Sequence, residues 1–382
     1  MSPGLVIGID ASRNRSGGAI AHLRGLLENA NPRRHGFTRL HVWVYGALVV
    51  RLPKRDWISY HSPAALEGNI LRQLFWQRTR LGGEARAAGC DIMLNTDAGT
   101  VGRFHPAVTM SRDMLSYEPG EIERYGFGKA RLRLFLLRHV QNRSLVRAEG
   151  AIFLTRYAGE VIQRSCGTLR HKAYVPHGVG ESFKMVRPRN PWPQPGDRDV
   201  RCVYVSNAAP YKHQDVVVRA IGRLRAEGYP VSLTLVGAGA GRTAASVAEQ
   251  VARSDPSGAF VTVTDFIAHD LLPEQLAEAD LFVFASSCEN MPNTLLEGMA
   301  VGLPIASSNR GPMPEVLEDG GVYFDPEDES SVATAIASLI DDPELRDVKM
   351  RRARELADAY SWQRCADETF GFLRNVYEGT HA

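Results

Sequence analysis

The chain has 382 residues, of which 44% are hydrophobic and 23% are charged, as in ordinary soluble globular proteins. This length exceeds a single ordinary core and suits two domains of roughly 180 residues each. The five cysteines are scattered and contain no Cys-x-x-Cys pair, which argues against a disulfide framework and a zinc site. The opening MSPGLVIGID has the pattern of a strand rather than a secretory signal, and the longest apolar run, VWVYGALVV, reaches about half a membrane span.

The net charge of +2 conceals two halves of opposite sign. Residues 1–185 contain 27 Lys and Arg against 14 Asp and Glu, a net +13, and residues 186–382 contain 18 against 29, a net −11. The basic half suits an anionic partner such as a membrane surface, an acidic substrate or nucleic acid. The alternative is that the opposite charges only help the two halves to associate, and both interpretations stay open.

The first half alternates strand and helix patterns. It begins with the strand GLVIGID, the loop ASRNRSGG and the helix AIAHLRGLLENA. Further strand patterns are RLHVWVYG, CDIMLNTD, AVTMSRDM, GAIFLT and HKAYVPHG, and helix patterns include NILRQLFWQRTRL and GKARLRLFLLRHVQNRSLVRA. This alternation indicates parallel βαβ units. Residues 186–199, VRPRNPWPQPGDRD, contain four prolines and no periodicity, which predicts an interdomain linker.

The second half repeats the alternation from VRCVYVSN to SSVATAIASLIDD, and the chain ends in an amphipathic helix, SWQRCADETFGFLRNVYE. We therefore predict an α/β fold of two doubly wound, Rossmann-like domains that face each other across a cleft. Residues 1–185 form the first domain, completed by the C-terminal helix at about 361–382. Residues 200–360 form the second, and ligands of such folds bind at the carboxyl ends of the strands.

Residues 288–304 read CENMPNTLLEGMAVGLP and follow the apolar run LFVFASS. Proline is tolerated at the start of a helix because it lacks an N–H group, so a helix should begin at Pro292 or Asn293. The unpaired amides of about Asn293, Thr294 and Leu295 would then form an anion site at the positive end of the helix dipole.

Two glutamates flank this predicted anion site. Glu289 lies in the preceding turn, and Glu297 lies in the helix with its side chain directed back toward the helix N-terminus. Carboxylates are poorly suited to an anion but accept hydrogen bonds from hydroxyls beside it, which predicts a nucleotide sugar as the ligand. The alternative is that Glu289 is an ordinary turn residue and Glu297 a solvated helix residue.

The longer segment FASSCENMPNTLLEGMAVGLPIASSNRGPMPEVL resembles the signature of the retaining glycosyltransferases of family 4, the group 1 glycosyltransferases with the GT-B fold. The resemblance is strong over 201–325 and weaker but collinear over 1–185. It implies that Glu289 contacts the donor sugar and that Glu297 binds the ribose hydroxyls. It also implies that the backbone between them holds the sugar and the diphosphate, at Asn290, Met291, Pro292, Asn293, Thr294 and Leu295.

A second match to the family is VYVSNAAPYKHQD. Lys212 stands at the position of a lysine that reaches the diphosphate, and a lysine suits a leaving phosphate. Asn207 stands where the family usually has Arg, and His213 where it usually has Gly. The alternative for Lys212 is an ordinary surface lysine.

The glycines of LVGAGAG follow a strand, but they are spaced Gly-x-Gly-x-Gly, and the following strand lacks the acidic residue of a dinucleotide site at the usual distance. We therefore do not expect NAD binding. The family resemblance instead places Gly237, and with it Phe266, among the donor-binding residues.

In the first half, SRNRSGGAIAH resembles the family's glycine loop, which implies that Gly17 and Gly18 lie close to donor and acceptor, although a plain turn is the alternative. VTMSRDMLSYEP aligns with a segment that commonly carries His-Asp. Here Arg112 precedes Asp113, so Arg112 becomes a candidate contact for donor or acceptor.

Residues 129–147, KARLRLFLLRHVQNRSLVR, contain six Lys and Arg and no acidic residue. The pattern is typical of a basic amphipathic helix on an anionic membrane. The alternative is a helix whose leucines enter the core while its arginines are solvated.

The resemblance implies a retaining, metal-independent transfer of a hexose to a hydroxyl of a growing bacterial surface glycan, with a lipid-linked acceptor as one option. The YKHQ form resembles bacterial surface-polysaccharide enzymes, many of which use GDP-mannose, so mannose is our preferred sugar. No cofactor, metal or nucleic-acid partner is expected. We expect a cytoplasmic protein, with peripheral contact to the inner face of the cytoplasmic membrane left open. The alternatives are a nucleotide-sugar-binding subunit without catalysis, a nucleotide-sugar 2-epimerase and a phosphorylase.

Overall fold

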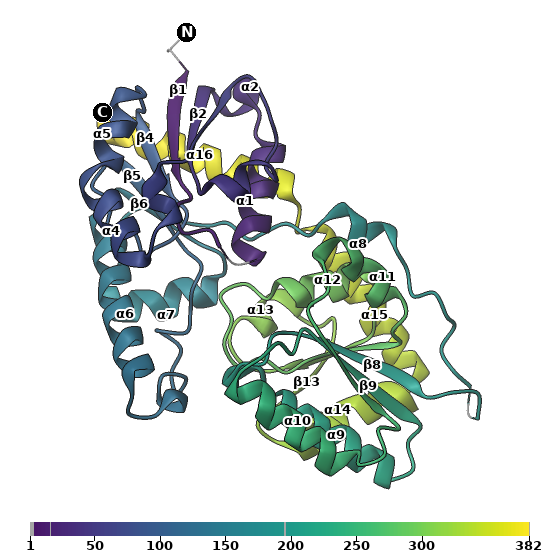
Figure 1. Ribbon diagram of the computed structural model, residues 1–382. Coiled ribbons are helices and arrows are strands. Elements are labelled where there is room, and N and C mark those ends of the chain that lie inside the picture. Colours follow the sequence, from purple (N-terminus) through teal and green to yellow (C-terminus); the bar gives the residue numbers. More distant parts are fainter. Residues whose placement is uncertain (1–3, 16, 195, 382) are drawn as a thin grey trace. The chain divides into compact units, whose positions relative to one another are not determined.

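The computed structural model describes residues 4–15, 17–194 and 196–381 (Figure 1). It divides into two compact units, one formed by the chain up to Gly178 together with the chain from Ser361, and the other by Val179–Tyr360. Each unit is built around one parallel sheet. This is the α/β class that the alternating strand and helix patterns predict.

Within its described residues, the first unit contains a seven-stranded sheet in the order β3-β2-β1-β4-β5-β6-β7. The strands are β1 Leu5–Asp10, β2 Phe37–Trp43, β3 Ile58–His61, β4 Ile92–Asn95, β5 Ala107–Ser111, β6 Gly150–Phe153 and β7 Lys172–Tyr174. The helices are α1 Gly17–Asn29, α2 Pro32–His35, α3 Gly46–Val49, η1 Ala64–Glu67, α4 Ile70–Thr79, α5 Leu81–Ala87, η2 Glu123–Tyr125, α6 Lys129–Arg147, α7 Arg156–Cys166 and α16 Trp362–His381. The strand order reverses between β1 and β4, so the loops that follow these two strands meet at one edge.

The second unit contains a six-stranded sheet in the order β10-β9-β8-β11-β12-β13, again counting described residues. The strands are β8 Val200–Val205, β9 Val231–Val236, β10 Val261–Thr264, β11 Leu281–Phe284, β12 Ile305–Ser308 and β13 Val322–Phe324. The helices are α8 Glu181–Met185, η3 Pro210–Lys212, α9 Gln214–Ala226, α10 Arg242–Ser254, η4 His269–Leu271, α11 Leu272–Ala277, α12 Asn293–Val301, α13 Met313–Leu317, α14 Glu329–Asp341 and α15 Pro343–Asp358. Here the strand order reverses between β8 and β11.

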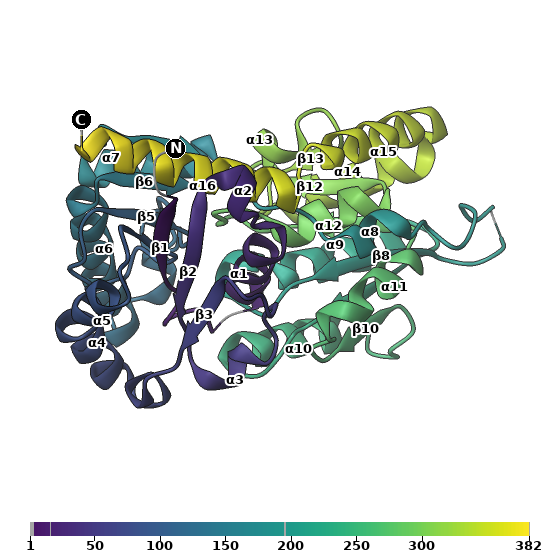
Figure 2. The ribbon, with the colours of Figure 1, turned by 90° about the horizontal axis from the view of Figure 1, so that it is seen from above.

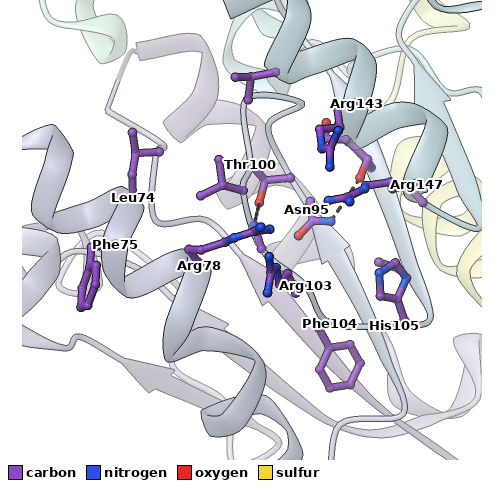
Figure 3. A pocket seen from close by; sticks show the side chains of 17 residues that line it. Leu74, Phe75, Arg78, Asn95, Thr100, Arg103, Phe104, His105, Arg143 and Arg147 are labelled. Carbon is purple, nitrogen blue, oxygen red and sulfur yellow. Dashed lines mark hydrogen bonds between the residues drawn. The ribbon is translucent and has the colours of Figure 1, made fainter.

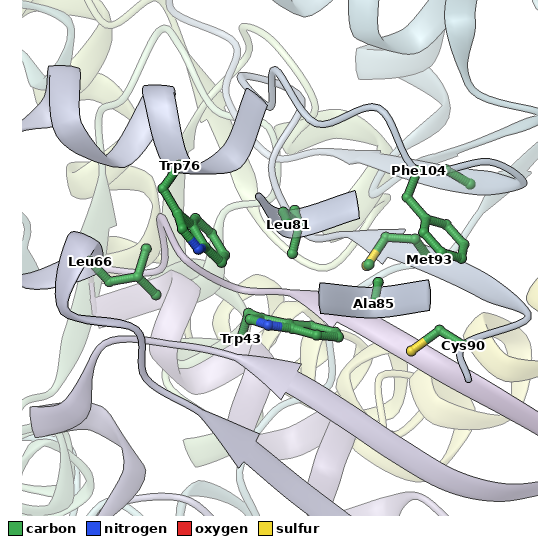
Figure 4. Packing of buried hydrophobic residues seen from close by; sticks show 9 residues of the cluster. Trp43, Leu66, Trp76, Leu81, Ala85, Cys90, Met93 and Phe104 are labelled. Atoms are coloured by element: carbon green, nitrogen blue, oxygen red, sulfur yellow. The ribbon is translucent and has the colours of Figure 1, made fainter. Parts of the chain in front are cut away.

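The central strands are buried on both faces, where helices and loops cover them. All four residues of β4, β6 and β11 are buried, which is the reason that their sequences are continuous apolar runs. In the first unit, Trp43 and Trp76 pack in a core cluster with Leu66, Leu81, Ala85, Cys90, Met93, Phe104 and Ala107 (Figure 4). Both indole N–H groups donate to the Glu84 carboxylate, at 2.9 and 2.8 Å, so neither buried donor is left without an acceptor.

The predicted linker, residues 186–199, falls within the second unit, and several of its described residues contact that unit. The Arg189 amide donates to the Ala277 carbonyl at 2.8 Å. Arg346 lies 3.8 Å from the centre of the Trp192 ring. The described residues of this stretch form no helix or strand, but Arg189, Trp192 and Arg198 find partners on the domain that follows.

The boundary between the units differs from the predicted one. Residues 179–185 belong to the second unit, because α8 packs against α12. The C-terminal helix α16 belongs to the first unit, where it contacts α1 and α2 (Figure 2). A boundary at Gly178 has no composition signal because it depends on packing between segments far apart in the sequence.

Candidate active site at the carboxyl ends of β8 and β11

The loops that follow β8 and β11 meet in the second unit, because these strands are neighbours at the point where the strand order reverses. The Ser287 amide donates to the Tyr211 carbonyl at 2.9 Å, which ties the two loops together. The buried Tyr204 hydroxyl donates to the Lys212 carbonyl at 2.7 Å and holds the first loop against its own strand. Both loops are therefore fixed by the strands that precede them.

Lys212 and Glu289 form an ion pair across these loops. Their side chains are largely buried, and the Lys212 ammonium also lies 5.3 Å from the Tyr211 ring centre and 5.7 Å from the Phe284 ring centre. A buried charge is stable only when it is paired, so each residue holds the other in position. The two residues predicted as catalytic are thus in direct contact.

His213 follows Lys212 with a left-handed backbone, φ 47° and ψ 35°, immediately before α9. This conformation is strained for a residue with a Cβ atom, which explains why glycine is usual at this position in the family that the sequence resembles. The His213 ring lies 2.8 Å from the Ser287 hydroxyl, Nε2 to Oγ. This side-chain contact links the two loops a second time and gives the histidine a function that glycine lacks.

Helix α12 begins at Asn293, with Pro292 as its N-cap residue, as the sequence predicts. The Asn293 amide donates to the Met291 carbonyl at 3.0 Å, so the prediction that this amide is unpaired is wrong. For the Thr294 and Leu295 amides the described part of the chain provides no acceptor outside the helix. The donors available to an anion therefore begin one residue later than predicted.

Glu297 is buried in α12, which contradicts the alternative of a solvated helix residue. One carboxylate oxygen lies 2.8 Å from Nε2 of His269, and the other is buried with no hydrogen-bond partner among the described residues. Burial raises the pKa of the Glu297 carboxyl, and the His269 contact partly opposes that shift. A buried acceptor without a donor is costly, and a ligand hydroxyl is the kind of group that would satisfy it.

The remaining predicted donor residues are placed around the same strand ends. Asn207 is exposed on the loop after β8. Gly237 follows β9 with φ 91°, a backbone that strains any residue with a side chain, and an added Cβ would make a tight contact of 3.3 Å with the Ser206 carbonyl oxygen. Phe266, after β10, is 82% exposed. Asn290 and Met291 are buried.

In the first unit, Gly17 and Gly18 are the first two residues of α1 rather than part of a loop, which corrects the predicted start of that helix. Both are exposed, and an added Cβ at Gly17 would meet no atom within 4 Å. The structure therefore supplies no packing reason for glycine at Gly17. The neighbouring Ser16 lies outside the described residues.

Arg112 and Asp113 follow β5 but have different environments. One Arg112 nitrogen donates to the Asn14 carboxamide oxygen at 2.7 Å, whereas Nε and Nη1 are buried without a partner among the described residues. Burial lowers the pKa of Arg112. Asp113 accepts from the Leu115 amide at 3.0 Å and faces α6 through Gln141 at 3.5 Å, so its contacts are those of a turn residue. Arg112 is the member of this pair that has donors left for a ligand.

Three polar residues at these sites were not predicted: Asn14, His269 and Ser287. Each is brought to its partner by the fold, from 98, 28 and 74 residues away in the chain respectively. Asn14 lies in the segment SRNRSGG that the sequence singles out, so its position is a signal that could have been used. Ser287 likewise lies in the segment FASSCENMP that carries the family resemblance, whereas His269 stands in a segment without a distinctive spacing.

Among the described residues, no helix has both the length and the hydropathy that a membrane span requires. Helix α6 has the predicted bounds, with Leu134 and Leu145 buried and Leu132 and Leu136 exposed. Its leucines are therefore divided between the core and the surface, and neither of the two predicted alternatives describes all of them.

The second half of the chain is similar in sequence to known proteins. Residues 199–342 match the family model described as glycosyl transferases group 1. O-antigen chain mannosyltransferase B of Escherichia coli is 29% identical over 110 residues, which cover 29% of each chain. A GDP-mannose-dependent phosphatidylinositol monomannoside mannosyltransferase of Mycolicibacterium smegmatis is 31% identical over 159 residues, 39% of this chain and 40% of the relative. The chain therefore matches less than half the length of these curated relatives.

The similarity in structure extends over nearly the whole chain. Sucrose-phosphate synthase from Thermosynechococcus elongatus superposes with a TM-score of 0.78 at 17% identity, covering 98% of this chain and 100% of that one. At this identity the match shows the fold alone. The two parallel-sheet units have the GT-B architecture, which confirms the predicted fold class.

Proposed function

Because residues 199–342 are a group 1 glycosyltransferase domain, we propose that the protein transfers a hexose from a nucleoside diphosphate sugar to a hydroxyl of a growing glycan. The observation that carries the proposal is the meeting of Lys212, Glu289 and the start of α12 at the β8/β11 reversal. A cation, a carboxylate and a helix N-terminus at this point form a site for a diphosphate beside a sugar.

Cleavage of the anomeric C–O bond develops positive charge on the sugar ring and negative charge on the departing diphosphate. Lys212 and the amides of Thr294 and Leu295 would stabilise the diphosphate. Glu289, which holds Lys212, would accept hydrogen bonds from the donor sugar. Because Asn207 carries no charge, Lys212 is the cation on which diphosphate stabilisation depends most.

Glu297 would bind the ribose hydroxyls through its unpartnered oxygen, while His269 holds the other. Phe266, exposed beside Gly237 on the neighbouring strand end, offers a ring face to the base. We propose GDP-mannose as the donor, since two relatives are mannosyltransferases by name and one is named as GDP-mannose-dependent. In the first unit, Arg112 with Asn14 is the proposed contact for donor or acceptor.

We further propose that the transfer is retaining and independent of metal ions. A glycan of the bacterial surface, lipid-linked or free, is the proposed acceptor. These finer points follow from the family resemblance and from the names of the relatives. Each of these points can be wrong while the proposed sugar transfer at this site is still correct.

The first prediction is that Lys212→Ala and Glu289→Ala each reduce sugar transfer by about a hundredfold or more, because each removes a group that acts on the departing diphosphate or the sugar. Purified protein is incubated with GDP-mannose, UDP-glucose and other donors, with and without EDTA, and nucleoside diphosphate release and the anomeric configuration of the product are measured. Glu344→Ala and Lys349→Ala on α15 are the matched controls. Thermal melting of every variant shows whether folding is intact.

Transfer near the wild-type rate in both site variants, with folding intact, would refute this assignment of the active site. Donor binding without turnover on any acceptor would instead favour a binding subunit. Conversion of the nucleotide sugar to its 2-epimer without an acceptor would indicate an epimerase. A reaction that requires inorganic phosphate would indicate a phosphorylase.

A further inference from the structure

The connection from β4 to β5 in the first unit contains no helix. It consists of residues 96–106 and crosses from the end of one parallel strand to the start of the next as a loop. Parallel strands are usually joined through a helix that covers the face of the sheet. The helix layer is therefore open over β4 and β5, between α4 on one side and α6 on the other.

A cavity of about 400 Å³ occupies this opening (Figure 3). Its floor includes Asn95 of β4 and Thr109 of β5, which are joined by a hydrogen bond of 3.1 Å from the Asn95 side-chain amide to the Thr109 hydroxyl. Residues of α4, the loop 100–105 and the second half of α6 form its walls. The cavity is large enough for a phosphate or diphosphate group together with part of an attached chain.

Four arginines line the cavity: Arg78 of α4, Arg103 of the loop, and Arg143 and Arg147 of α6. Figure 3 shows them placed around Asn95 and Thr100. Within the described chain none of the four has a hydrogen-bond or ion-pair partner, and no acidic residue lines the cavity. Uncompensated like charges around one concave space create a positive potential that favours an anion, and the guanidinium fork suits phosphate oxygens.

The cavity also has an apolar side. Leu74, Phe75, Phe104 and Val140 contribute to its lining. Phe75 is 67% exposed, and the nearby Leu71 on α4 is 73% exposed, so the apolar surface continues out of the cavity onto the helix. A small inorganic anion would leave this surface uncovered, whereas a phosphate with an apolar chain would use both parts.

The cavity extends along the face of the sheet from the carboxyl edge, where Asn95 and Thr100 lie, toward the amino-terminal edge. Helix α6 leads from β5 back to the start of β6, so Arg147 at its end lies toward the amino-terminal edge. Asn14 and Arg112 follow β1 and β5 and lie at the carboxyl edge. Arg147 is therefore remote from the pair of Asn14 and Arg112, whereas Arg78 and Asn95 adjoin Gln77 and Thr96, which contact Asp10 and Asn14.

We propose that this cavity binds the phosphate or diphosphate head of an amphiphilic lipid. The four arginines would contact the phosphate oxygens, and Phe75 and Leu71 would contact the apolar chain of the lipid. The inference stands on the first unit alone and does not require the transferase activity. It would give the protein a specific lipid contact in its basic half, apart from the donor site.

Isothermal titration of the full chain with dodecyl phosphate, inorganic pyrophosphate and dodecyl maltoside tests this proposal. We expect dodecyl phosphate to bind most tightly, pyrophosphate more weakly, and the neutral maltoside not at all. Arg78→Ala with Arg147→Ala should weaken dodecyl phosphate binding by about tenfold or more per arginine, since each loses a charge-assisted hydrogen bond. Added salt should weaken it further.

Arg164→Ala with Arg170→Ala removes two exposed arginines elsewhere in the same unit and should leave binding unchanged. Val140→Trp fills the apolar side of the cavity and should weaken the binding of dodecyl phosphate more than the binding of pyrophosphate. Glu297→Gln should weaken donor binding but not dodecyl phosphate binding, so failure of the proposed function would not be mistaken for failure here. Wild-type binding by the Arg78/Arg147 variant overturns the proposal, and so does equal binding of pyrophosphate or of the maltoside.

Discussion

Glu297 is a carboxylate whose position has a cost for the folded protein. Its side chain is buried, one oxygen has no partner among the described residues, and burial raises the pKa of the carboxyl. A carboxyl whose pKa is higher in the folded chain than in the unfolded chain disfavours folding once the pH exceeds its pKa in the unfolded chain, because the charged form must then be buried. Such a cost is common at sites where stability is exchanged for ligand binding.

We predict that Glu297→Gln keeps or raises the melting temperature at neutral pH while it weakens nucleotide-sugar binding by about tenfold or more. Glutamine has nearly the same volume and no charge to bury, but its amide accepts hydrogen bonds from ribose hydroxyls less well. Thermal melting and titration with GDP-mannose and GDP measure the two effects. Glu344→Gln on α15 is the exposed control, and a loss of stability without a loss of affinity would show that Glu297 is only structural.

The sequence anticipated much of this site at the scale of single residues. Pro292 as the start of a helix follows from proline chemistry, and two glutamates around it follow from their spacing. The partners could not be predicted. His269 reaches Glu297 only because η4 packs near α12, and His213 shows its left-handed backbone only in the folded turn.

At the scale of elements, the packing of α16 in the first unit depends on two glycines. A Cβ added at Gly178 would lie 2.2 Å from the backbone nitrogen of Trp362, and one added at Gly25 would lie 2.3 Å from the Trp362 ring. The Trp362 nitrogen near Gly178 is a backbone atom, so it cannot relieve the clash by a change of rotamer as a side chain can. The chain at Gly178 and the start of α16 therefore approach each other at a distance that only glycine permits.

We predict that Gly178→Ala lowers the free energy of unfolding of the first unit by about 1–3 kcal/mol, as overpacking of a close contact does. Gly371→Ala, in the same helix α16 and with no atom within 4 Å of the added Cβ, should be neutral or stabilising by about 0.5–1 kcal/mol. Urea unfolding followed by circular dichroism measures both variants. Equal stability of the two would mean that α16 shifts to accommodate the new methyl group.

At the scale of the whole molecule, the pH dependence of folding should include a contribution from His22. This histidine is fully buried in the first unit and stacks on His177 with 4.5 Å between ring centres. Burial first, and then the charges of His177 and Arg112, lower the pKa of His22 well below 6.5. The unfolded chain therefore takes up a proton that the folded chain excludes, and stability falls as the pH drops below about 6.5.

We predict that the free energy of unfolding of the wild type falls between about pH 7 and pH 5 by more than that of His22→Leu, with a slope of up to about 1.4 kcal/mol per pH unit. Leucine fills a similar volume and takes up no proton. His139→Leu, which replaces an exposed histidine of α6, should follow the wild-type curve. Parallel curves for wild type and His22→Leu would show that protonation of His22 is not linked to folding.

The sequence by itself determined the fold class and predicted where a donor site would lie. Runs such as LFVF and IMLN, in a chain that alternates strand and helix patterns, indicate buried strands of a parallel sheet. Residues 288–304 carry the helix start and both glutamates in one continuous segment. These features are local, so neighbouring residues are enough to predict them.

The tertiary structure decided which residues meet. Lys212 and Glu289 are 77 residues apart and pair because β8 and β11 are adjacent in the sheet. The boundary at Gly178 and the packing of residues 186–199 depend in the same way on distant partners. The arginine cavity exists because the β4–β5 connection lacks a helix, and its four arginines come from three segments that only the folded sheet brings together.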